Sequence, residues 1–163
     1  AKIVSNLPYH LTTPILARLL PLQNMISSLT VMVQKEVADR MCSSPNTYDY
    51  SSFTLFLRFY AEIDKGFTVS RNCFYPAPKI DSQVVHITLQ PPPLTGEAAS
   101  HFFQLTRTAF GKRRKMLRAS LKELYPPKKV EEALSLLQKP SSTRPQELDL
   151  SQFLTLYHLL NST

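Results

Sequence analysis

The fold is decided by residues 29–41, which have the sequence LTVMVQKEVADRM. The range 29–33 is a short, nearly continuous apolar run, and it predicts a strand buried on both faces of a parallel sheet. The range 35–41 follows directly with the pattern of a helix. A buried strand followed by a helix is typical of α/β proteins, whose functional loops lie beyond the carboxyl ends of the strands.

The segment before this stretch adds another strand and another helix. Ile3 and Val4 indicate the end of a buried strand, and a helix is expected over 12–20, where Pro21 stops it. The break between them is the tetrapeptide NLPY at residues 6–9. The order strand, loop, helix, strand, helix again predicts an α/β fold.

The segment after it predicts the rest of a mixed sheet. A helix is expected over 51–60, with an apolar stripe at i, i+3, i+4 and i+7. Strands are expected over 67–69 and 82–89, joined by an irregular stretch over 71–79, and they close the sheet in antiparallel fashion. The stripe, which we assign to the core, consists of Phe53, Phe56, Leu57 and Tyr60.

Three consecutive prolines, 91–93, mark a domain boundary because they donate no backbone hydrogen bonds and favour an extended conformation. We therefore expect two domains, residues 1–93 and residues 94–163. The second is predicted to be a small all-α domain with helices over 97–110, 112–124, 127–138 and 150–160.

Composition narrows the possible functions. Only three glycines occur in the 163 residues, and they are scattered, so no glycine-rich phosphate-binding loop is present. Lys and Arg number 19 against 12 Asp and Glu, a net charge of +7. This excess favours a polyanionic partner, with nucleic acid ahead of an acidic membrane surface.

Other site classes lack their sequence signals. Cys42 and Cys73 are far apart and the four histidines are scattered, so neither a metal site nor a disulfide is indicated. Reduced cysteines and the lack of a long apolar run predict a cytoplasmic protein without a membrane span. There is no G-x-S-x-G or H-E-x-x-H motif, so hydrolase and metalloenzyme functions have little support.

The NLPY segment is the first candidate site. Pro8 restricts Leu7 to extended conformations, which fixes the direction of the neighbouring carbonyl groups. The carboxamide oxygen of Asn6 and a backbone carbonyl could accept both hydrogens of an exocyclic amine on a nucleobase, and Tyr9 could stack on that base. The alternative is an Asx-type turn that ends the strand, with Tyr9 as an aromatic side chain at its rim.

A proline-rich loop, FYPAPK at residues 74–79, is the second candidate. Its alternating prolines stiffen the chain, so that Phe74 could clamp a planar ligand while Lys79 meets a phosphate. The alternative is a polyproline-like crossover with Phe74 in the core.

The third candidate is a basic segment that contains no acidic residue. At about 100° per residue, Lys112, Lys115, Arg118 and Lys122 share one face of the helix expected over 112–124. Arg113 projects on the apolar side, where it would be buried and paired unless the helix begins after it. A phosphate-contacting surface and a merely solvated face are the two interpretations. The seven cations are Arg107, Lys112, Arg113, Arg114, Lys115, Arg118 and Lys122.

Together these segments resemble the ribosomal RNA adenine dimethyltransferases. The stretches that carry the resemblance occur in the family's order, and NLPY combined with an F-x-P-x-P-K-[VI]-x-S segment is specific. The branch it most resembles is the bacterial one that dimethylates two adjacent adenosines near the 3′ end of small-subunit ribosomal RNA. The stretches are NLPYHLTTPIL, MVQKEVADRM, FYPAPKIDSQVV, RTAFGKRRKMLRASL and RPQELDLSQF.

The resemblance implies specific roles for the candidate residues. Asn6 and the backbone around Leu7 and Pro8 would hold the target adenine's amine against the methyl group of S-adenosylmethionine, with Asn6 also close to that cofactor. Tyr9 and Phe74 would sandwich a flipped base. The helical domain and Lys79 would bind ribosomal RNA by shape and phosphate contacts.

The resemblance also implies what the chain lacks. It corresponds to the second half of a Rossmann-like catalytic domain, residues 1–93, followed by the helical RNA-binding domain. The glycine-rich cofactor loop has no counterpart here, so we expect a piece of a longer, monomeric enzyme that is inactive by itself. Three alternatives remain: a large-subunit adenine methyltransferase of the macrolide-resistance type, a non-catalytic nucleic-acid-binding module, and a helix-turn-helix DNA binder over 99–124.

Overall fold

A computed structural model describes residues 1–162 and divides the chain into two compact units. The first unit consists of Ala1–Ser43 and Phe56–Pro93, and the second of Ser44–Leu55 and the chain from Leu94 onward. The division after Pro93 coincides with the boundary expected from the triple proline. The segment Ser44–Leu55 differs from the expected domain bounds. It was expected in the first domain, residues 1–93, but it packs with the second unit.

The first unit contains a four-stranded mixed sheet in the order β1-β2-β4-β3. β1 pairs with β2 in parallel, whereas β4 is antiparallel to both β2 and β3. The α/β class with antiparallel closing strands is therefore confirmed. The strands are β1 (Lys2–Asn6), β2 (Ser28–Gln34), β3 (Ala61–Val69) and β4 (Ser82–Leu89).

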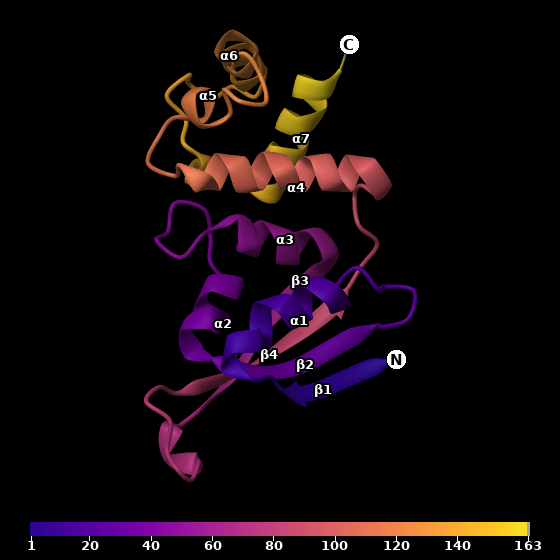
Figure 1. Cartoon of the computed structure of the whole chain (residues 1–163), viewed down its shortest axis with the longest axis vertical. Coiled ribbons are helices and arrows are strands. Elements are labelled where there is room, and N and C mark those ends of the chain that lie inside the picture. The colour runs from indigo at the N-terminus through magenta and orange to yellow at the C-terminus, as the bar shows by residue number, and fades with distance from the viewer. Residues whose placement is uncertain (163) are drawn as a thin grey trace. The chain divides into compact units, whose positions relative to one another are not determined.

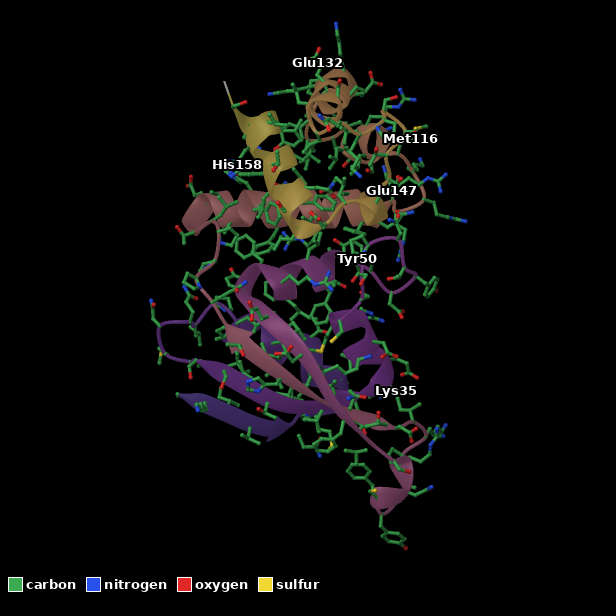
Figure 2. The ribbon with its side chains drawn as sticks, turned by 180° about the vertical axis from the view of Figure 1, so that it is seen from behind. Lys35, Tyr50, Met116, Glu132, Glu147 and His158 are labelled. Carbon is green, nitrogen blue, oxygen red and sulfur yellow. The ribbon has the colours of Figure 1, made fainter. Side chains whose placement is uncertain are left out.

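One face of this sheet is covered by α1 (Thr12–Leu19) and α2 (Lys35–Met41), which lie in front of the strands in Figure 1 and behind them in Figure 2. β2 alternates accordingly, with Leu29, Val31 and Val33 fully buried and the residues between them only half-buried. The expectation that β2 is buried on both faces is wrong, because helices cover one side only.

The expectation that Ile3 and Val4 belong to a buried strand is wrong for Val4, which lies on β1 at the edge of the sheet. Val4 is 82% exposed, because alternate side chains of β1 point to the face that α1 and α2 leave open. On the same open face, Thr30 Oγ1 and His86 Nδ1 lie 2.8 Å apart across the β2–β4 pair.

Helix α3 (Ser52–Tyr60) carries more apolar surface than its predicted stripe. Leu57 and Tyr60 are buried as expected, but Phe53 and Phe56 are only half-buried, and Leu55 and Phe59 are buried instead. The helix spans the division between the units, since the first unit resumes at Phe56.

The second unit is helical, as predicted. Its core is formed by large side chains such as Phe102, Leu105 and Phe153, all fully buried. Asp149 and Gln152 cap the last helix reciprocally, each side chain accepting from the other's backbone N–H at 2.8 and 3.0 Å. The helices are α4 (Gly96–Gly111), α5 (Leu117–Ser120), α6 (Pro127–Leu136) and α7 (Leu150–Asn161).

The long basic helix expected over 112–124 is wrong. Helix α4 ends at Gly111, a turn closes with Lys115 N donating to Lys112 O at 2.9 Å, and only the four residues Leu117–Ser120 are helical. The backbone N–H of Leu117 donates to Thr143 O at 2.8 Å, which ties this segment to a neighbouring loop. The four cations Lys112–Lys115 directly follow the carboxyl end of α4, where the helix dipole favours positive charge.

Short 3₁₀ helices complete the chain: η1 (Tyr9–Leu11), η2 (Arg71–Cys73) and η3 (Pro145–Glu147). Within the described part of the chain, no helix has the length and apolar character needed to cross a membrane. The same residues hold no group of three or more His, Cys, Asp or Glu side chains placed to bind a metal ion.

Candidate functional site

A cavity of about 380 Å³ lies in the first unit, where two loops meet. Its volume is in the range of small-molecule sites. The structure thus brings together the two segments that the sequence analysis singled out separately. The lining residues are Asn6, Leu7, Pro8, Tyr9, Phe74, Tyr75, Pro76 and Pro78.

The first wall is built by the chain that leaves β1. Asn6 is the last residue of the strand and is exposed, whereas the next side chain, Leu7, is buried and its N–H donates to Met32 O at 3.2 Å. The carbonyl of Pro8 is already used, since it accepts from Leu11 N at 3.0 Å and from Thr12 Oγ1 at 3.3 Å.

Two oxygen acceptors on this wall remain available. Among the residues that the structure describes, neither the Asn6 carboxamide nor the Leu7 carbonyl has a hydrogen-bond partner. The structure therefore narrows the expected acceptor set to the Asn6 side chain and the Leu7 carbonyl, because the carbonyl of Pro8 belongs to the turn that starts η1.

Two aromatic residues of the cavity, Tyr9 and Phe74, are held in place by neighbouring segments. The Tyr9 hydroxyl lies 3.0 Å from Oγ of Ser82, a fully buried residue at the start of β4. Phe74 follows η2, which Ser70 caps by accepting from Asn72 N at 3.2 Å. Both rings are half-buried, so each is held by the protein and still presents surface to the cavity.

The second wall is the proline-rich loop, which supplies Phe74, Tyr75, Pro76 and Pro78. Arg71, which the sequence analysis did not predict, fastens this loop. Arg71 donates to the Asp81 carboxylate from its backbone N at 2.9 Å and from Nε at 3.1 Å, and to Lys79 O at 2.6 Å. Asp81 O in turn accepts from the backbone N of Lys35, the first residue of α2, at 3.0 Å; Figure 2 labels this lysine. These contacts fix the two ends of the proline-rich loop, and with them the segment in which Phe74 lines the cavity.

This closure predicts a pH dependence. Hydrogen bonds from the backbone N–H of Arg71 and then from its guanidinium lower the pKa of Asp81. A carboxylate with a lowered folded-state pKa stabilises its loop fully above about pH 4, and this contribution is lost as the pH falls through the lowered value. Titration of Asp81 by carboxyl-carbon NMR should give a pKa below the usual range, and Arg71→Ala should raise it partway. A normal pKa in the unmodified protein would show that the closure does not form.

The predicted RNA-binding cations differ in their surroundings. Arg118 pairs with Glu131 at 2.5 Å and Lys112 lies 3.8 Å from Glu123, so part of their charge is compensated. The helix begins after Arg113, at Leu117, which is the second of the two alternatives expected for this residue; Arg113 is half-buried and donates to the carbonyls of Thr47 and Tyr48. The remaining five are exposed and form no ion pair with any residue of 1–162: Lys79, Arg107, Arg114, Lys115 and Lys122.

Comparison with known proteins identifies the family. The model of the family described as ribosomal RNA adenine dimethylase matches residues 1–162. Ribosomal RNA small subunit methyltransferase A of Protochlamydia amoebophila is 56% identical over 163 residues, which cover 100% of this chain and 57% of that protein. The protein of the same name from Chlamydia muridarum is 48% identical over 161 residues, 98% of this chain and 58% of that protein.

Solved structures show the same fold. A dimethyladenosine transferase from Plasmodium falciparum superposes with a TM-score of 0.79 at 24% identity, over 95% of this chain and 65% of that one. The 23S rRNA methyltransferase ErmE superposes with a TM-score of 0.73 at 26% identity, over 99% of this chain and 65% of that one. The predicted Rossmann-like α/β class is thereby confirmed.

The curated relatives are longer than this chain, which spans somewhat less than three fifths of their length. The residues matched by the family model, 1–162, include both walls of the cavity and the basic segment. The chain belongs to the ribosomal RNA adenine dimethylase family.

Proposed function

We propose that the protein containing this chain dimethylates two adjacent adenosines near the 3′ end of small-subunit ribosomal RNA, in the cytoplasm, with S-adenosylmethionine as methyl donor. The observation that carries the proposal is the cavity in which the acceptors of Asn6 and Leu7, which have no hydrogen-bond partner in residues 1–162, lie beside Tyr9 and Phe74. These residues supply the pocket for the target adenine.

The acceptors explain how the adenine nitrogen becomes a nucleophile. Asn6 and the Leu7 carbonyl accept the two hydrogens of the exocyclic amine, which turns its lone pair out of conjugation with the ring. Held in this way by Asn6 and Leu7, the nitrogen would be oriented toward the methyl group that S-adenosylmethionine would supply, and after the transfer it would release a proton to water. No strong general base is required, because the methylated, ammonium-like nitrogen is acidic.

The aromatic residues hold the base for this attack. Chemistry on a base requires that the base leave its stack, and a flipped base is commonly held between aromatic side chains. Tyr9, fixed by Ser82, and Phe74, fixed by the closed loop, would take the two faces of the adenine. Because the two rings would hold the adenine from both faces, they would also fix the orientation of its exocyclic nitrogen.

The residues of the cavity would make only a small part of the contacts to S-adenosylmethionine. S-adenosylmethionine supplies the methyl group when bound, and its sulfonium is positively charged, so unpartnered oxygen acceptors such as those of Asn6 and Leu7 suit its neighbourhood. Asn6 is the contact that we assign to it. We propose that other parts of the protein hold the rest of the cofactor, and that residues 1–163 do not catalyse the reaction by themselves.

The second unit would bind the RNA, and its cations predict the salt dependence. Removing Arg114 and Lys115 together should reduce the slope of log affinity against log salt concentration by about 1.4, because each phosphate contact on single-stranded RNA contributes about 0.7. Arg118→Ala should change the slope less, since Glu131 already compensates that charge. Affinities for a ribosomal RNA fragment measured between low and moderate salt test this, and an unchanged slope in the double variant would remove the segment from the interface.

Large-subunit RNA is a second candidate substrate, because the fold also matches the 23S rRNA methyltransferase ErmE. The relatives with much higher identity are small-subunit methyltransferases, which favours the first proposal. The intact protein, incubated with methyl-labelled S-adenosylmethionine and each RNA in turn, should label the small-subunit RNA, and mass mapping should place the label on adenine. Label on the large-subunit RNA alone would support the second candidate, and no label on either would support a binding module without catalysis.

A further inference from the structure

An exposed aromatic side chain lies next to the basic segment of the second unit. Tyr48 is 90% exposed, and the guanidinium carbon of Arg113 lies 5.9 Å from the centre of its ring. Arg113 also donates to the backbone carbonyls of Tyr48 at 2.8 Å and Thr47 at 3.2 Å. A cation on one face of the ring leaves the other face open to solvent.

The loop that carries Tyr48 is fixed at both ends. Before Tyr48, the backbone N of Asn46 donates to Gln146 O at 2.8 Å and Thr47 Oγ1 donates to Ser44 O at 2.6 Å. After it, the fully buried Tyr50 donates its hydroxyl to Leu148 O at 2.6 Å. An aromatic ring on such a loop loses little conformational entropy when a ligand stacks on it, because the backbone is already ordered.

We propose that Tyr48 is a stacking platform for an unpaired RNA base, with the adjacent phosphates held by Arg114 and Lys115. The proposal rests on the proposed RNA-binding function of this unit and adds a residue to it. A polyanion is the partner that suits the charge, since Arg113, which contacts Tyr48, is one of the four consecutive cations Lys112–Lys115. An exposed ring beside cations suits single-stranded RNA, whose bases stack on aromatic side chains while the backbone follows positive charge.

The contacts of Arg113 with this loop allow two roles for Tyr48, one in which only its backbone matters and one in which its ring binds RNA. If Arg113 only fastens the loop through the two carbonyls, the ring of Tyr48 is dispensable and any side chain at this position will serve. If the ring binds RNA, its removal weakens binding although no charge is lost. The sequence alone does not bring Tyr48 near the basic segment, since residues 44–55 are expected in the first domain and pack with the second unit.

The first test measures binding of a fluorescein-labelled, single-stranded adenine oligonucleotide of about ten nucleotides to the intact protein. Tyr48→Ala should weaken affinity by about fivefold to 100-fold with an unchanged salt slope, and Tyr48→Phe, which keeps the ring, should bind like the unmodified protein. Phe67→Ala, which removes a 68% exposed ring from β3 in the first unit, should have no effect. Affinity of Tyr48→Ala within twofold of the unmodified protein would overturn the proposal.

The second test follows the ring directly. These 163 residues contain no tryptophan, so Tyr48→Trp adds one to them, and the emission that this variant gains over the unmodified protein should be quenched when a base stacks on it. RNA that binds without changing this emission would overturn the stacking role. If the unmodified protein binds RNA with a strong salt dependence, but Tyr48→Ala binds equally well and the emission of Tyr48→Trp does not change, the further inference alone fails. If the unmodified protein does not bind RNA, the proposed function fails with it.

Discussion

Asn6→Ala should lower the rate of methyl transfer by about 10²–10³-fold, comparable to removing one group from a preorganised polar site. The carboxamide is one of the two acceptors of the first wall that have no partner among the described residues, so its loss leaves the Leu7 carbonyl to orient the amine alone. RNA affinity should be unchanged, because the variant removes no positive charge and leaves every cation assigned to RNA binding, Lys79 included, in place. Single-turnover methyl transfer with the intact protein, together with a direct binding measurement, separates the two effects.

The matched control is Asn24→Ala, which removes another exposed carboxamide from the first unit at a position that does not line the cavity. That variant should retain full activity. Asn6→Ala with undiminished transfer would contradict the pocket assignment and would favour a module that binds nucleic acid without catalysis. A variant that lost RNA binding and activity together would indicate instead that Asn6 supports the fold of the loop.

Most of the first unit was predictable because its signals are local. The apolar run at 29–33 and the alternation over 82–89 specify strands through side-chain burial alone, and both strands form within a residue or two of the expected limits. What local sequence could not show is how many faces are covered. Val4 is as apolar as Val31, yet one is exposed and the other buried, because helices cover only one side of the sheet.

The two walls of the cavity were each visible in the sequence, but their meeting was not. Tyr9 and Ser82 are 73 positions apart, and their contact depends on β4 lying antiparallel beside β2. Only the family resemblance linked the two segments in advance. The pair Arg71 and Asp81 carries no sequence signal, since an arginine ten residues before an aspartate is common and acquires meaning only when the loop closes.

The basic segment shows how helical periodicity fails. Counting 100° per residue from Lys112 produced a convincing charged face, yet the segment is a turn followed by four helical residues. Met116 is extended, with ψ at 147°, and the N–H of Leu117 bonds to Thr143 O. A loop distant in sequence therefore decides where the helix restarts, which overrides local propensity.

Tyr50→Ala should lower the free energy of unfolding of the second unit by about 3–5 kcal/mol, the usual cost of truncating a buried aromatic side chain. Tyr50 is fully buried, packs edge-on against Phe110 with ring centres 5.8 Å apart, and donates its hydroxyl to Leu148 O. Tyr50→Phe should cost about 1–3 kcal/mol, because it keeps the ring but leaves a buried carbonyl without that donor. Urea-induced unfolding followed by circular dichroism measures both.

Tyr48→Ala provides the matched comparison, since it removes the same ring two positions away, where the side chain is 90% exposed. It should change stability by no more than about 0.5 kcal/mol. Hydrogen exchange then tests which unit the loop supports: Tyr50→Ala should increase exchange in α4 more than in β2, because Ser44–Leu55 packs with the helical unit. Equal stability of the two alanine variants, or faster exchange confined to the sheet, would show that Ser44–Leu55 packs with the first unit. Tyr48 would then not lie beside the basic segment.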